Sequence, residues 1–195
     1  MTIDMERGGE AACTLSERDK FVLEVSISVA TGLRKSAARN NIRQMSDFVN
    51  GMIFCGLLMN ESDAGEETAF AAAFQRKTRL YRKAFEEGAI RRSEVALAEM
   101  AQHSLGVSDM SASDMLITLG LSAEGTIREI GDECGLSASE RVDATIATIT
   151  LAVLSTTCKD KIDTVFWSVE QAIAEKERTW KSFPGTEGEG RGLML

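Results

Sequence analysis

Apolar residues recur every three or four positions along most of the chain, which is the spacing of one face of an α-helix. Ser16 is a candidate N-terminal cap, and a stripe of apolar residues follows it from Phe21 to Leu33. The same period predicts three further helices in the first half of the chain, over about residues 41–60, 66–87 and 93–103. The helix over 41–60 is apolar on most sides, so we expect it at the centre of the core.

Glycines divide the second half of the chain into shorter segments. They predict short helices near residues 112–119 and 123–134, followed by long helices over 138–157 and 159–181. Strictly alternating stretches, typical of β-strands, are missing, and the one proline, Pro184, follows the last predicted helix. The fold class predicted from these patterns is all-α, a compact bundle of six to eight helices.

The predicted helices occupy residues 15–182, which we expect to form one domain. Residues 1–14 carry no helical stripe and are expected to be flexible, while the Gly-rich residues 183–195 are expected to form a disordered tail. The longest apolar run, Met52 to Met59, is too short to span a membrane, which needs about 20 helical residues. Without a basic and then apolar leader at its start, the sequence favours a cytoplasmic protein.

The sequence contains few residues that indicate a catalytic, cofactor or metal site. The four cysteines, Cys13, Cys55, Cys134 and Cys158, form no CxxC pair, and such isolated cysteines are mostly small buried apolar residues in a reducing compartment. The one histidine, His103, ends a predicted helix, and no nucleophile motif accompanies it. A GxxxxGK[ST] phosphate-binding loop is also missing. The sequence therefore predicts no catalytic residue, no cofactor and no bound metal.

Charge is unevenly distributed along the chain, whose net charge is −8. Residues 34–92 hold 11 lysines and arginines against 7 acidic residues, whereas residues 94–189 hold 7 against 17. A face of solvated charges would explain this pattern, and so would a surface complementary to a partner. The candidates for binding a partner are six basic residues on or just after the helix predicted over 66–87: Arg76, Arg79, Arg82, Lys83, Arg91 and Arg92.

The segment from Thr126 to Ile146 resembles a helix-turn-helix. Cys134 would lie inward at the end of the first helix, and Gly135 would adopt the left-handed conformation of the turn. Leu136 would pack beneath that turn, and Ser137 would cap the second helix. Any two helices joined by a glycine turn share much of this pattern, so a plain helical hairpin also explains it.

A DNA-binding regulator built on this motif would use residues 123–157. Its candidates for contacting DNA are Ser137, Ser139 and Arg141. The same helix carries Glu140 and Asp143 within a strongly acidic half of the chain, and phosphate groups would be repelled there. Nucleic acid is therefore the less favoured partner.

The function predicted is that of a non-enzymatic regulatory, inhibitory or chaperone-like protein that acts by binding another protein. The missing catalytic motifs, the uneven charge and the nine methionines, which suit adaptable surfaces, favour this function. A helix-turn-helix DNA-binding regulator is the first alternative, and an enzyme whose site is assembled from distant residues is the second. We also expect a homodimer, because Met45, Phe48 and Met59 do not all fit one inward face.

Overall fold

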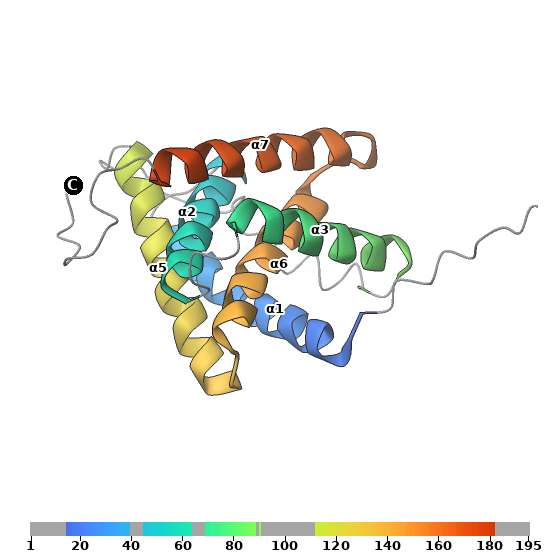
Figure 1. Cartoon of the computed structure of the whole chain (residues 1–195), viewed down its shortest axis with the longest axis horizontal. Helices are drawn as coiled ribbons and strands as arrows, with labels where there is room; N and C mark the ends of the chain where they lie inside the picture. The colour runs from blue at the N-terminus through green and yellow to red at the C-terminus, as the bar shows by residue number, and fades with distance from the viewer. Residues whose placement is uncertain (1–14, 40–44, 64–68, 89, 91–111, 182–195) are drawn as a thin grey trace, which may run out of the picture.

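The computed structural model describes residues 15–39, 45–63, 69–88, 90 and 112–181. These residues form six α-helices, one 3₁₀ turn and no strand (Figure 1). In chain order the elements are α1 (Glu17–Arg39), α2 (Met45–Asp63), α3 (Phe70–Glu86), α5 (Ala112–Cys134), α6 (Ala138–Thr156), the 3₁₀ turn η2 (Lys159–Lys161) and α7 (Ile162–Lys181). The all-α prediction is confirmed for this part of the chain, which accounts for six helices of the six to eight predicted for the whole. No helix of the described part combines the length and the apolarity needed to cross a membrane.

Helix α6 lies at the centre of the bundle and contacts each of the other five α-helices of the described part. Every residue from Ala144 to Leu154 is buried, because this stretch is built from alanine, threonine, isoleucine, leucine and valine. Its threonine hydroxyls donate to carbonyl oxygens one turn earlier, as Thr148 does to Ala144 at 2.8 Å, so burial leaves them satisfied. The helix expected at the centre, over 41–60, corresponds to α2, which is largely buried but lies to one side of α6.

Helix α5 is continuous from Ala112 to Cys134, so the prediction of two short helices over 112–119 and 123–134 is wrong. The reason is the packing of Gly120 against α2. A Cβ atom at Gly120 would lie 2.4 Å from the ring of Phe54, so only glycine permits this close approach. The glycine here serves helix packing and does not end the helix.

Two helix starts agree with the predicted caps. The hydroxyl of Ser16 accepts a hydrogen bond from the backbone N–H of Asp19 at 3.0 Å, and α1 begins at the next residue, Glu17. At the start of α6, Ser137 and Glu140 form a complete capping box, in which the Ser137 backbone N–H donates to the Glu140 carboxylate at 2.8 Å. Local sequence therefore determines where these two helices begin.

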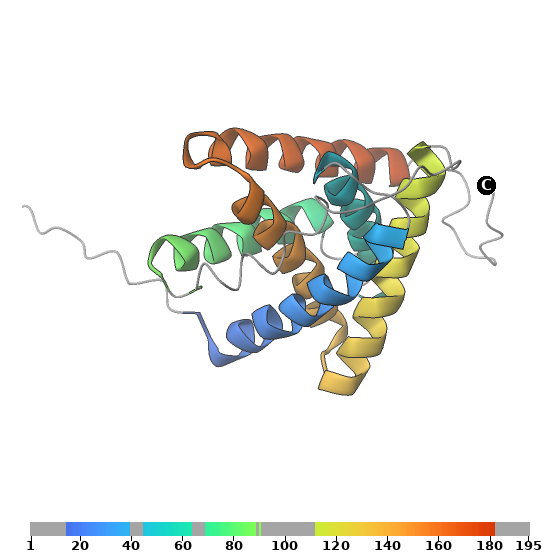
Figure 2. The ribbon, with the colours of Figure 1, turned by 180° about the vertical axis from the view of Figure 1, so that it is seen from behind.

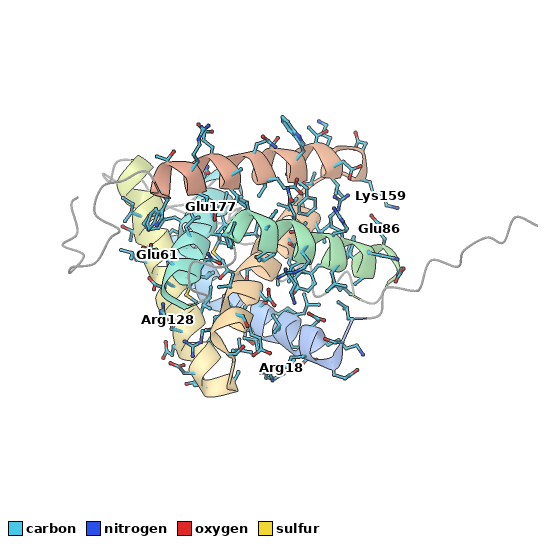
Figure 3. The ribbon with its side chains drawn as sticks, viewed as in Figure 1. Arg18, Glu61, Glu86, Arg128, Lys159 and Glu177 are labelled. Carbon is cyan, nitrogen blue, oxygen red and sulfur yellow. The ribbon has the colours of Figure 1, made fainter. Side chains whose placement is uncertain are left out.

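Helix α7 lies antiparallel to α3 along one side of the bundle (Figure 1, Figure 2). Near the end of α7, the carboxylate of Glu177 accepts hydrogen bonds from the backbone N–H groups of Phe70 at 2.9 Å and Ala71 at 3.3 Å (Figure 3). The residue before α3 is Ala69, whose side chain cannot cap the helix. Glu177 therefore supplies from another helix the acceptor that α3 lacks at its own start.

Several predicted boundaries differ from the structure. Helix α2 continues to Asp63, although residues 60–65 were expected to be a turn. Helix α3 begins at Phe70 rather than Glu66, and the first residues of the segment predicted over 159–181 form the turn η2. Other predictions lie outside the described residues: the helix over 93–103 with His103, residues 1–14, the tail over 183–195, and Arg91 and Arg92.

The packing of α2 removes the premise of the predicted homodimer. Phe48 and Met59 are both 0% exposed within the single chain, because α2 is covered by α3, α5, α6 and α7. The side chain of Met45 lies outside the described part. Self-association thus stays a prediction without support from α2.

The prediction of buried cysteines holds for one of the three that the structure describes. Cys55 lies in the core, and burial raises the pKa of its thiol. Cys134 and Cys158 are exposed, because one is the last residue of α5 and the other precedes the turn η2. All three are free thiols.

Candidate partner-binding surface

Helix α3 presents its basic residues on two sides. Its apolar side, with Phe70, Phe74 and Tyr81, is buried. Arg76 and Arg79 are exposed on the opposite side, and neither lies within ion-pair distance of a residue that the structure describes, although the charge of Arg76 acts to lower the pKa of Asp143. Because they are three residues apart, the two guanidinium groups lie on one face of the helix.

The other predicted members of the basic cluster are less available. Lys83 shares the outer face but lies 4.0 Å from Glu87, one turn later. Arg82 turns towards α7, where it pairs with Asp163 and lies over the ring of Phe166, 4.8 Å from its centroid. Arg82 therefore joins α3 to α7 and does not belong to the free surface. Its role in binding a partner stays a prediction.

Trp167 on α7 is the residue that the sequence analysis missed. Its side chain is 62% exposed, and the only other large exposed apolar residue in the described part is Leu121, at 43%. The sequence does indicate that this side chain is exposed, because Trp167 falls outside the inward stripe that Phe166, Val169 and Ile173 define. A tryptophan on the polar side of an amphipathic helix is typical of an interaction surface.

Arg79 and Trp167 lie at the same level on adjacent helices. The ion pair between Arg82 and Asp163 fixes one point where α3 and α7 meet, and the two helices run antiparallel from it (Figure 1). Arg79 comes about one turn before Arg82, and Trp167 comes about one turn after Asp163. The antiparallel arrangement therefore brings the two exposed side chains to either side of the α3–α7 seam. We call Arg79 and Trp167, together with Arg76 one turn before Arg79 on the outer face of α3, the seam surface.

A second group of polar side chains lies largely shielded from solvent between α1, α3 and α6. The Nζ atom of Lys77 is 2.9 Å from Oδ1 of Asp19 and 2.7 Å from Oδ2 of Asp143, and the three side chains are 15–18% exposed. The hydroxyl of Tyr81 is buried and makes no hydrogen bond with a described residue. We call these four residues the buried ionic cluster.

Burial and the mutual charges of its members shift the pKa values of Lys77, Asp143 and Tyr81 in the buried ionic cluster. Burial lowers the pKa of Lys77, but its hydrogen bonds to Asp143 and Asp19 outweigh burial, so the pKa is raised. Burial raises the pKa of Asp143, and its bond to Lys77 offsets only part of that effect. Burial, followed by the charges of Asp143 and Asp19, also raises the pKa of Tyr81. The ion pairs of Lys77 with Asp19 and Asp143 join α1, α3 and α6 at this cluster.

The α5–α6 hairpin has the predicted turn but not the exposed second helix. Gly135 adopts a φ of +67°, and Leu136 beneath it is buried, as expected. The inward position expected of Cys134 is wrong, since it is exposed. Beyond its first two turns α6 is buried on all sides, whereas a helix that enters a DNA groove must present one open face.

The three candidates for contacting DNA lie at the start of α6. Ser137 caps the helix, Ser139 is exposed beside it, and Arg141 pairs with Asp132 at the end of α5. Arg18 of α1 closes the same turn from outside, donating to the Glu140 carboxylate at 2.8 Å and to the Gly135 carbonyl at 3.1 Å (Figure 3). These contacts tie Ser137 and Arg141 to the fold, and the hydroxyl of Ser139 lies 3.3 Å from that of Ser137, within hydrogen-bond distance.

Within the described residues, no group of three or more histidine, cysteine, aspartate or glutamate side chains is placed to hold a metal ion. Comparison of the chain with models of protein families, with curated proteins and with solved structures found no match. The seam surface is therefore the candidate functional site on the grounds of its own exposure and chemistry.

Proposed function

We propose that this protein is a non-enzymatic regulatory protein that acts by binding another protein through the seam surface. The observation that carries the proposal is the exposure of Trp167, at 62%, level with Arg79 across the α3–α7 seam. Tryptophan and arginine are the residues most enriched among those that contribute most to protein–protein binding. Regulation, inhibition and chaperone-like holding are the modes of action that such a surface serves.

The surface is suited to binding because the helices beneath it are held rigidly. Glu177 and the pair between Arg82 and Asp163 join α3 and α7 at two separated points. The backbone of two helices joined in this way loses little freedom when a partner docks, so only the ordering of the exposed side chains opposes binding. Free thiols at the described cysteines support the proposed cytoplasmic location.

Affinity capture from the native cell tests this function with three forms of the protein. The unmodified chain and an Arg178→Glu variant should retain the same partner protein, because Arg178 is an exposed residue of α7 about three turns from Trp167. A Trp167→Ala variant should lose it. Equal capture by all three forms, or capture of no protein, would contradict the proposal. Light scattering on the same samples tests homodimer formation separately.

A further inference from the structure

We infer that the segment docking on the seam surface is acidic and carries an aromatic residue, an inference that rests on the protein-binding function proposed above. The argument uses contacts inside this chain. Arginine and tryptophan residues elsewhere in the fold show which groups satisfy them, and the exposed members of the seam surface lack those groups.

Two arginines of the described part are each satisfied by a carboxylate together with an aromatic ring. Arg82 pairs with Asp163 and lies 4.8 Å from the centroid of Phe166. Arg18 pairs with Glu140 and lies 5.1 Å from the centroid of the Phe21 ring. A guanidinium is suited to both contacts at once, because its plane stacks on a ring while its edge donates to a carboxylate. Arg79 makes neither contact with a described residue.

The second tryptophan, Trp180, shows the same combination. Its indole N–H donates to the Glu61 carboxylate at 2.7 Å, and its ring meets the ring of Phe54 edge-on, with centroids 5.4 Å apart. Trp167 has no such ring contact or hydrogen bond with a described residue. A carboxylate and an aromatic ring on one segment would thus satisfy Arg79 and Trp167 together.

The charges around the seam surface favour a short acidic segment over a nucleic acid. Arg76 adds a second cation one turn from Arg79. Of the two α7 carboxylates about one turn from Trp167, Asp163 already pairs with Arg82, and Glu170 is the one that opposes an acidic segment. A nucleic acid gains affinity from many phosphate contacts, and the net charge of −8 would repel a long polyanion. A segment with one or two carboxylates can be bound by the cations of the seam surface alone.

The test uses a short helical peptide in which glutamate and phenylalanine are spaced one turn apart. Matched peptides carry glutamine for glutamate or alanine for phenylalanine. The two tryptophans give two indole N–H signals in an NMR spectrum, assigned with Trp167→Phe. The acidic aromatic peptide should shift the Trp167 signal and leave that of Trp180, which is engaged by Glu61, in place. Both matched peptides should bind at least about tenfold more weakly.

Variants of the protein separate the seam surface from general charge. Arg79→Gln should weaken binding of the acidic peptide by about tenfold, while the control Arg178→Gln should leave it unchanged. Glu170→Gln removes a carboxylate one turn from Trp167 and should tighten binding. An unmoved Trp167 signal, equal binding of the glutamine peptide, or a stronger response to a short DNA duplex would overturn the inference. If capture still depends on Trp167 in that case, the proposed function stands and only the partner's chemistry is wrong.

Discussion

Lys77 of α3 and Asp143 of α6 meet with 2.7 Å between Nζ and Oδ2, and Asp19 of α1 approaches the same ammonium group at 2.9 Å. Lys77→Met would leave two partly buried aspartates without their cation. We expect the free energy of unfolding to fall by about 2–4 kcal/mol, measured by urea denaturation. Lys20→Met is the control: Lys20 pairs with Glu17 on the open surface, so its loss should change stability by less than about 0.5 kcal/mol.

Removing the hydroxyl of Tyr81 should have the opposite effect. The group is buried and makes no hydrogen bond with a described residue, so none of these residues replaces the contacts with water that it loses on folding. We expect Tyr81→Phe to raise the free energy of unfolding by up to about 1 kcal/mol. A clear loss of stability would instead reveal a bound water molecule that pairs with the hydroxyl.

The cap that Glu177 provides from α7 can be tested by its removal. Glu177→Ala leaves the backbone N–H groups of Phe70 and Ala71 without their acceptor, and we expect a loss of about 1–2 kcal/mol in thermal or urea unfolding. Glu175→Ala, at an exposed position on the same helix, should change stability little. Equal effects of the two substitutions would show that the cap contributes nothing.

Two glycine substitutions should act in opposite directions. A Cβ atom at Gly56 would lie 2.2 Å from the Phe70 ring, so Gly56→Ala should cost about 1–3 kcal/mol through overpacking of α2 against α3. At Gly125, inside α5, the same atom would meet nothing within 4 Å. Gly125→Ala should therefore stabilise the protein by up to about 1 kcal/mol through helix propensity. Destabilisation at both positions would contradict the open space at Gly125.

The capping box at α6 predicts a specific dependence on pH. Hydrogen bonds from Arg18, and then from Ser137, lower the pKa of Glu140 from 4.5 to about 2. A carboxyl whose pKa is lower in the folded state stabilises the fold above its unfolded pKa, and that contribution is lost as pH falls. Glu140→Gln should thus be less stable than the unmodified chain at pH 6, and the difference should shrink between pH 4.5 and 2. Urea unfolding across this range measures it, with the exposed Glu129→Gln as control. A difference independent of pH would contradict the prediction.

Local signals in the sequence predicted some features well, and long-range contacts explain the rest. Ser137, Gly135 and Glu140 could be placed from their own spacing, because a cap or a turn depends on neighbouring residues. The contact of Arg82 with α7 could not be predicted in this way, since its partner Asp163 is far away in the sequence. Likewise the sequence around Gly120 predicts the end of a helix, because nothing nearby in the sequence indicates its contact with Phe54. The sequence predicted part of the candidate surface, namely Arg76 and Arg79, but not Trp167.

The central position of α6 also bears on how the chain is made. Helix α6 follows α1, α2 and α3 in the sequence, yet it provides the inner wall against which each of them packs. During synthesis on a ribosome, α6 cannot cover the apolar faces of these earlier helices until residues 138–156 have left the exit tunnel. For most of translation the nascent chain therefore exposes surface that other nascent chains or chaperones can bind. Contacts between segments so far apart in sequence also make the final assembly of the core slower than the formation of its helices.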